Sequence, residues 1–240
     1  MKAAASAPGV LHRARRFAWR HPEWWVAVAA AGAWVWMLTV PHPNAGHAGH
    51  RAGPDLRWTG VMVVAMMLPL TIPHVRHVAE SSLWRRRHRG IAGFLAGYVA
   101  VWMLAMMAIV AALDAGSRLA EWTVVAGLVT AAAVLWEVAP GRRRLLHRCG
   151  RTMPLAPRGW RADADCARFG LRSGASCVAV CWALMAACVV FAHSLPVMAV
   201  LFGVQLSGRY RRDPSPALAA LAVLGICLAA LAARLAGGHA

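Results

Sequence analysis

Seven apolar stretches constrain the fold of this chain more than any other feature of its sequence. A transmembrane α-helix needs roughly 20 predominantly apolar residues to cross about 30 Å of hydrocarbon, and most of the stretches approach that length. They are residues 24–40, 58–75, 91–113, 119–139, 174–193, 196–207 and 216–236. Because lipid offers no hydrogen-bond partners, such segments cross it as helices. The sequence therefore predicts an all-α fold, a polytopic transmembrane helix bundle of about seven spans.

The overall composition supports a membrane protein. Hydrophobic residues make up 60% of the 240 residues and charged residues only 15%, whereas a soluble domain is about half apolar and a quarter charged. Within the second stretch, Pro69 and Pro73 predict a kink or an early end. The sixth stretch is short enough to be re-entrant. Glu121 and Glu137 lie near the ends of the fourth stretch, where we expect solvent to reach them.

Positive charge separates the two sides of the predicted bundle. Of the 26 Lys and Arg residues, 22 fall in the N-terminus and in the second, fourth and sixth loops. Positive residues stay on the cytoplasmic side of a membrane, so we predict a cytoplasmic N-terminus and a multi-pass protein of the plasma (inner) membrane. The net charge of +17 is then a consequence of topology. It favours contact with anionic lipid and not with nucleic acid.

The chain divides into two predicted regions. Residues 1–54 hold a basic segment, a first membrane anchor and an outer loop that contains histidines. Residues 55–236 form a multi-span membrane domain, and its longest cytoplasmic connection is the basic, irregular loop 140–173.

The fifth stretch carries sulfur along one helical face. Cys177, Cys181, Met185 and Cys188 are spaced by three or four residues, which places them on the same side of a helix. Thiolate and thioether ligands select Cu(I), and thiolates also bind zinc. Cys and Met are equally common as packing residues, so the spacing alone leaves both interpretations open.

The second stretch offers further thioethers. Met62 and Met66 share a helical face, and Met67 follows directly. In the predicted topology, Met66 and Met67 lie near the midplane of the bilayer, as does Met185 of the fifth stretch. We therefore expect these methionines to meet Cys177 and Cys181, which lie in the cytoplasmic half.

Histidines supply secondary candidate ligands. The first outer loop carries His42, His47 and His50 within nine residues rich in Gly and Pro, a pattern that can collect a divalent or copper ion. A solvated polar loop explains the same residues equally well. His74 lies at the inner end of the second stretch.

Motifs of the common enzyme classes are missing from the sequence. It contains no P-loop or dinucleotide-binding fingerprint, no G-x-S-x-G nucleophile and no H-E-x-x-H motif. We therefore predict a protein without enzymatic activity.

Several of these motifs occur together in a known pattern. Trp58 to Pro69 reads W…M…A-M-M-x-P, and Cys181 to Met185 reads C-W-x-L-M. Together they resemble the bacterial family catalogued as predicted metal-binding integral membrane proteins, a multi-span domain of unknown function. The resemblance covers roughly residues 55–235 and extends through Gly97-Tyr98…Trp102, Pro140…Cys149, Gly170…Gly174…Cys177 and Met198. It implies a metal-binding membrane protein and adds Cys149 and Met198 to the secondary candidates.

The chain departs from this family at three positions. The family commonly has two adjacent Cys before the Trp, where this chain has Val180 and Cys181. It tends to carry a second Cys in the loop after the fourth stretch, where this chain has Leu145. Glu137 stands where the family usually has Gln.

We therefore predict a protein that binds a soft metal, most simply copper with zinc as the alternative, and that acts in metal delivery or transport. Its expected partners are the lipid bilayer, the metal ion and a membrane or extracytoplasmic metalloprotein, with no nucleic acid. One alternative is a membrane scaffold or assembly subunit without metal. A less favoured one is an intramembrane redox protein that uses Cys177 and Cys181 as a dithiol.

Overall fold

The computed structural model describes residues 17, 21–40, 56–211 and 215–237, and within these ranges it contains helices and connecting turns but no strand. The all-α prediction is thus confirmed for the described part of the chain. His42, His47 and His50 lie outside it. The helices are α2 (Trp24–Thr39), α3 (Leu56–Met67), η1 (Pro69–Thr71), α4 (Ile72–Ser81), η2 (Trp84–Arg86), α5 (Arg87–Leu119), α6 (Trp122–Val138), α7 (Pro140–Cys149), α8 (Gly159–Val190), α9 (Leu195–Tyr210) and α10 (Pro216–Gly237).

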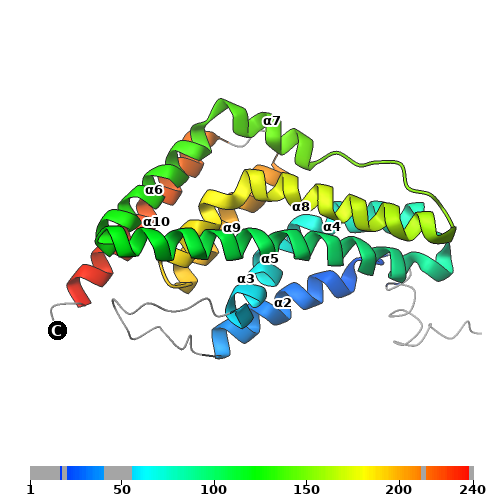
Figure 1. Cartoon of the computed structure of the whole chain (residues 1–240), viewed down its shortest axis with the longest axis horizontal. Coiled ribbons are helices and arrows are strands. Elements are labelled where there is room, and N and C mark those ends of the chain that lie inside the picture. Colours follow the sequence, from blue (N-terminus) through cyan, green and yellow to red (C-terminus); the bar gives the residue numbers. More distant parts are fainter. Residues whose placement is uncertain (1–16, 18–20, 41–55, 212–214, 238–240) are drawn as a thin grey trace, which may run out of the picture.

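Two long helices, α5 and α8, form the axis of the molecule and run side by side along its length (Figure 1). Their contact depends on glycines. A Cβ atom on Gly170 of α8 would lie 2.0 Å from the Phe94 carbonyl oxygen of α5, and one on Gly97 would lie 2.6 Å from the Ala167 carbonyl oxygen. Both distances are far below a van der Waals contact, so the two backbones approach this closely only because the side chains are missing. Small residues do the same at helix interfaces in membranes.

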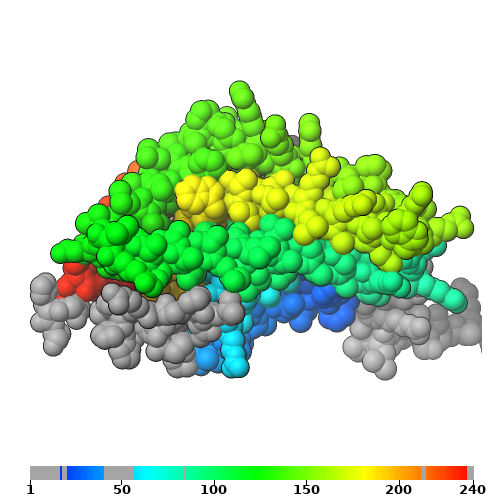
Figure 2. Space-filling view, in the orientation of Figure 1, coloured from blue at the N-terminus to red at the C-terminus, as the bar shows by residue number. Residues whose placement is uncertain are grey.

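The remaining helices pack around this pair. On one side, α6 and α10 lie against each other, and α7 crosses the end of the bundle above α8 (Figure 1). On the other side, α3 packs against α2 and α5, and α4 packs against α5. In the space-filling view the side chains of α5 and α8 form one continuous surface (Figure 2). The core is rich in fully buried Met and Phe side chains, and it also contains Trp102.

The second apolar stretch breaks where its prolines predict. The axes of α3 and the η1–α4 segment differ by 40°. Because Pro69 has no N–H, the Ala65 carbonyl loses its helical partner, and the Trp34 indole N–H donates to it at 3.0 Å. The Pro69 carbonyl accepts the Ile72 N–H in the 3-10 turn, and the Tyr210 hydroxyl donates a second hydrogen bond to it at 2.8 Å. Trp34 of α2 therefore replaces the hydrogen bond that Pro69 removes, and Tyr210 of α9 adds a further one at the same break.

The prediction of an irregular loop at residues 140–173 is wrong, because two helices, α7 and the first part of α8, occupy most of this segment. Pro140 starts α7 at a first-turn position, where a missing N–H costs nothing. The first half of α8 is helical despite its arginines because it buries a residue on every turn against the core. These residues are Ala162, Cys166, Phe169, Gly170 and Ser173.

Three helices, α5, α8 and α10, are long and apolar enough to cross a membrane, and five spans result if each bent pair, α3 with α4 and α6 with α7, counts as one. α2 and α9 have 16 residues each, so the count of seven spans stays a prediction. Large apolar side chains point outward on four helices, with 63–68% of their surface exposed. They are Leu38, Leu104, Leu128, Leu135, Leu218 and Leu221.

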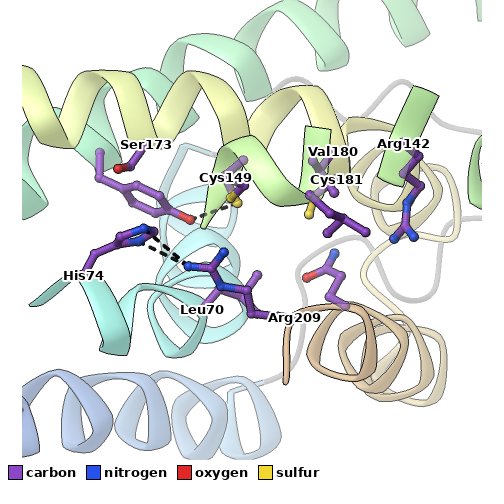
Figure 3. A pocket seen from close by; sticks show the side chains of 12 residues that line it. Leu70, His74, Arg142, Cys149, Ser173, Val180, Cys181 and Arg209 are labelled. Carbon is purple, nitrogen blue, oxygen red and sulfur yellow. Dashed lines mark hydrogen bonds between the residues drawn. The ribbon is translucent and has the colours of Figure 1, made fainter. Parts of the chain in front are cut away.

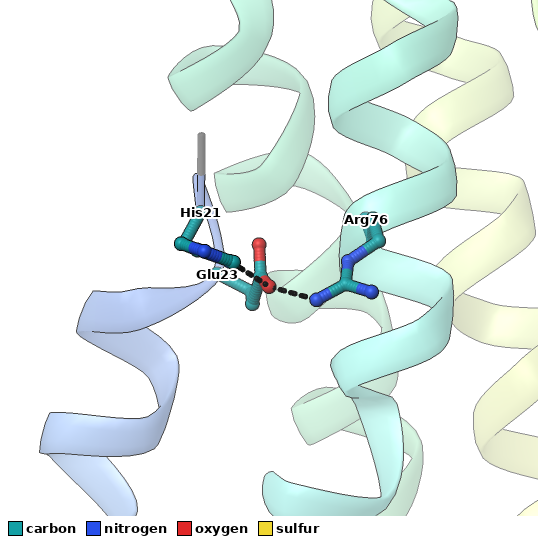
Figure 4. A network of polar contacts seen from close by, with 3 residues as sticks. All are labelled: His21, Glu23 and Arg76. Carbon is teal, nitrogen blue, oxygen red and sulfur yellow. Dashed lines mark hydrogen bonds and ion pairs between the residues drawn. The ribbon is translucent and has the colours of Figure 1, made fainter. Parts of the chain in front are cut away.

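A buried carboxylate fastens α2 to the inner bundle. Glu23, just before α2, contacts the Arg76 guanidinium of α4 and lies 3.4 Å from His21 (Figure 4). Burial by itself raises the pKa of Glu23, but the hydrogen bonds and charge of Arg76 outweigh it and hold the pKa below its ordinary value. A carboxyl whose pKa falls on folding stabilises the fold above its unfolded pKa, and this contribution is lost as the pH falls through the folded pKa.

We expect Glu23→Gln to lower the free energy of unfolding at pH 7 by about 1 kcal/mol or less, because Arg76 is half exposed and solvent screens the pair. The difference from the wild type shrinks as the pH falls through the lowered pKa of Glu23 in the folded state, because the carboxyl is then protonated. Unfolding in detergent, followed by circular dichroism at several pH values, measures both effects. Asp114→Asn, which removes a more exposed pair with Arg118, is the control. An E23Q effect that does not depend on pH contradicts this prediction.

The glycine contact predicts a second, larger effect. Gly170→Ala pushes α5 and α8 apart, and we expect a loss of about 1–3 kcal/mol of unfolding free energy, as in other overpacked cores. Gly127→Ala is the matched control, since a Cβ there meets nothing within 4 Å. Equal stability of the two variants, measured in the same detergent, would contradict the role of the contact.

Candidate metal site

A small cavity of about 20 Å³ lies where α4, α5, α7, α8 and α9 converge (Figure 3). This volume is about what one water-sized particle occupies. Three cysteines, Cys149, Cys177 and Cys181, line it together with polar and apolar side chains. The other lining residues are Leu70, His74, Tyr98, Arg142, Leu146, Ser173, Val180, Gln205 and Arg209.

The three thiols form a connected group centred on Cys177. Its thiol lies close enough to the thiols of Cys149 and Cys181 for the three groups to interact electrostatically. Cys177 and Cys181 lie one turn apart on α8, and Cys149 is the last residue of α7. All three side chains are buried and all are free cysteines. The sequence-predicted pair Cys177 and Cys181 is thus joined by Cys149, a residue about 30 positions earlier.

The arrangement of the thiols suits a soft monovalent ion with two ligands better than an ion that needs three or more ligands around it. Within the described part of the chain, no three His, Cys, Asp or Glu side chains are already arranged to hold one metal ion together. The thiols instead follow one another with Cys177 in the middle. Two neighbouring sulfur atoms are sufficient for a two-coordinate Cu(I), and thiolates are the ligands that this ion prefers.

Tyr98 connects this group to the break in the second apolar stretch. Its hydroxyl lies 3.1 Å from the Cys177 sulfur and 3.4 Å from the Met67 carbonyl oxygen. Since Thr71 donates its N–H to Leu68 in the 3-10 turn, the Met67 carbonyl needs this other donor. Tyr98 has one proton and therefore donates to one of the two acceptors at a time.

A second sulfur group lies deeper along α8. The Cys188 thiol contacts the Met66 thioether at 3.9 Å, and Cys188 also lies close enough to Cys227 of α10 for their charges to interact. We predicted that Met66, Met67 and Met185 lie at a similar depth, and this stays a prediction. The thiol in contact with Met66 belongs to Cys188, about one turn beyond Met185. The other predicted methionines are fully buried in the same core: Met62, Met67, Met185 and Met198.

The expectation that solvent reaches Glu137 is wrong. Glu137 is only 2% exposed, and its carboxylate lies 2.8 Å from the Arg142 guanidinium. The two residues flank the 74° bend between α6 and α7, which turns Arg142 back over the end of α6. Neither Glu137 oxygen has a well-aligned hydrogen bond among the described residues, so the pair is held by charge.

Helix α9 supplies the polar wall of the cavity. Arg209 Nη2 lies 3.5 and 3.4 Å from the two ring nitrogens of His74. Gln205, one turn earlier on the same face, is 3% exposed, and neither end of its amide has a hydrogen-bond partner among the described residues. The i, i+4 spacing of Gln205 and Arg209 indicates a shared helical face, but nothing in the sequence connects that face to the cysteines.

The family model described as PpoB2, copper chaperone, matches residues 56–234. This match covers most of the sequence, and the chain belongs to that family. No curated protein and no solved structure matches the chain. The expectation of a metal-related family is confirmed at this level, and the family description favours copper over zinc.

Tyr98→Phe removes the donor that serves Met67 and Cys177 in the buried core, and we expect it to cost about 1–2 kcal/mol of unfolding free energy. Tyr210→Phe also removes a hydroxyl donor, but the Pro69 carbonyl keeps the Ile72 N–H. Tyr210 is 52% exposed and water can replace its hydroxyl, so we expect a smaller loss. Denaturant unfolding of both variants measures the difference. A larger effect for Y210F than for Y98F contradicts this account.

Proposed function

We propose that this member of the PpoB2 family is a membrane-embedded carrier that binds Cu(I) through Cys149, Cys177 and Cys181 and delivers it to another protein. The observation that carries the proposal is the convergence of these three thiols, from two separate helices, in one buried cavity. The family description supplies copper, and thiolates are among the ligands that select its monovalent form.

Binding requires the thiols to lose protons, because the thiolate is the form that coordinates a metal. In a buried site the metal itself supplies the positive charge that stabilises a thiolate. The metal-free carrier therefore holds neutral thiols, and copper replaces their protons. Zinc is the alternative cargo, since thiolates bind it as well.

The second sulfur group, which contains Cys188 and Met66, suggests a path for copper beyond the cavity. From the cavity, the sulfur atoms continue along the face of α8 to Cys188, which contacts Met66 of α3. Met62, Met67 and Met185 are buried around this contact. Thioethers are neutral and bind Cu(I) without losing a proton, so the ion can pass along this row without a proton transfer at each step, and it carries its single positive charge with it. We propose that copper moves along this row between the inner cavity and the outer half of the bundle.

The arrangement of charged residues supports a multi-pass protein of the plasma membrane. Segments assigned to the cytoplasmic side pair with one another: Glu23 contacts Arg76, and Asp163 lies 2.7 Å from Arg86 and 2.9 Å from Arg89. Arg142, Leu146 and Cys149, which line the cavity, belong to the segment 140–173 that is assigned to the cytoplasmic side, so in this proposal copper is held toward that side of the bundle. The recipient in this proposal is a membrane or extracytoplasmic metalloprotein, and the protein acts as a carrier without enzymatic activity.

Copper retention tests the site. The full chain is purified in detergent under reducing conditions, loaded with Cu(I) and washed with a competing chelator, and its copper content is measured by elemental analysis. We expect near-stoichiometric copper in the wild type and a loss of most of it in Cys177→Ser, because Cys177 is the member of the group that interacts with both other thiols.

Cys166→Ser is the matched control, because Cys166 is a buried thiol of the same helix that lies beside Arg86 and Asp163, away from the cavity. Cys188→Ser separates the inner cavity from the deeper group: we expect it to retain the inner copper ion. Wild-type protein that keeps no copper, or C177S and C166S variants that behave alike, would refute the proposed site and favour a scaffold role.

A further inference from the structure

The charge of a metal–thiolate complex depends on the metal. With any given number of thiolate ligands, a Cu(I) complex is one unit more negative than the Zn(II) complex. Two thiolates give a net charge of −1 with Cu(I) and 0 with Zn(II). In a buried cavity an uncompensated charge is costly, so the charges that surround the thiols bear directly on the choice of metal.

Two guanidinium groups line the cavity, and they differ in their partners. Arg142 is already paired with the Glu137 carboxylate at 2.8 Å. Arg209 forms no ion pair with a carboxylate within 4 Å among the described residues, and its Nη2 contacts the imidazole of His74. Figure 3 shows Arg209 beside His74, with Cys149 and Cys181 above it in the view. One positive charge of the cavity is therefore not neutralised by a neighbouring carboxylate.

Arg209 also lies next to the thiols. Its Nη1 is 3.4 Å from the position that a Cβ on Gly150 would take, and Gly150 directly follows Cys149. The guanidinium is near enough to the Cys149 sulfur to act on its charge. Arg209 itself is only partly buried, and solvent thus offsets the cost of its charge while the cavity contains no anion.

We infer that Arg209 makes the cavity selective for Cu(I) over Zn(II) by neutralising the extra negative charge of the Cu(I)–thiolate complex. This inference rests on the proposed function, and it assigns a role to a residue that is not a ligand. With two thiolates, Arg209 and the Cu(I) complex sum to zero charge, whereas Arg209 beside the neutral Zn(II) complex leaves one positive charge in excess.

Gln205 supports this assignment independently. Its amide lines the cavity, is almost fully buried and has no hydrogen-bond partner among the described residues. A buried polar group without a partner is costly, and an amide N–H is a suitable donor to a thiolate sulfur. Gln205 and Arg209 lie one turn apart on α9, so a single helical face presents both a donor and a positive charge to an anionic complex.

The test measures the affinities of two metals in the same variants of the full chain in detergent. Cu(I) affinity is measured by competition with a chromogenic Cu(I) chelator, and Ag(I) serves as a monovalent ion that does not change its oxidation state. Zn(II) affinity is measured against a fluorescent zinc chelator. For Arg209→Gln we expect Cu(I) and Ag(I) affinity to fall about tenfold or more and Zn(II) affinity to stay equal or rise.

Two further variants define the cause. Arg209→Lys keeps the charge and should restore most of the preference for Cu(I). Arg148→Gln removes an exposed arginine next to Cys149 and should leave both affinities unchanged, because solvent screens its charge. Circular dichroism and size-exclusion profiles compare the folding of all variants.

The outcomes are distinguishable. A wild-type protein that binds neither Cu(I) nor Zn(II) refutes the proposed function itself. If the wild type binds copper, equal losses for both metals in R209Q show a structural role and overturn the inference. Unchanged affinities in R209Q overturn it as well.

Discussion

The close contact between α5 and α8 is the interaction on which the rest of the structure depends. Gly97 and Gly170 allow the two backbones to touch, and this sets the position of every side chain that faces the seam. Tyr98 follows Gly97 directly, and its hydroxyl reaches Cys177 of α8 at 3.1 Å. Close packing of small residues is also the main source of helix association in bilayers, where helices gain little from burying apolar surface against each other.

The proline break in the second apolar stretch is the other constraint on the structure. The hydrogen bonds that side chains donate at this break connect it to the cavity. Pro69 leaves the Ala65 carbonyl without its helical partner, and aromatic side chains from three other helices donate hydrogen bonds to carbonyl groups at the break. Trp34 and Tyr210 bond the Ala65 and Pro69 carbonyls, while Tyr98 is shared between Met67 and a candidate ligand. Broken helices in membrane proteins are tolerated where neighbours restore the lost hydrogen bonds, and here one of these neighbours, Tyr98, lines the cavity of the candidate site.

The candidate site could be predicted only in part. The helical spacing of Cys177 and Cys181 placed them on one face, and this followed from local geometry alone. Cys149 was a secondary candidate on the basis of family resemblance, because no periodicity connects the end of α7 to the middle of α8. Arg209 and Gln205 were missed, since each is an ordinary residue near the end of an apolar helix until the packing of α9 brings it to the thiols. Glu137 was misjudged for the same reason: its burial depends on the bend that returns Arg142 to it.

The sequence by itself determined what depends on neighbouring residues along the chain: the helical fold, the apolar stretches, the break at Pro69 and the sulfur-bearing face of the fifth stretch. Each follows from a 3.6-residue period, a missing N–H or a count of apolar residues. Only the tertiary structure decided that Cys149 joins Cys177 and Cys181 at one cavity, that Cys188 contacts Met66, and that a guanidinium with no carboxylate partner among the described residues lies beside the thiols. Those facts depend on the angles and depths at which helices pack, which are set by contacts between residues far apart in the sequence.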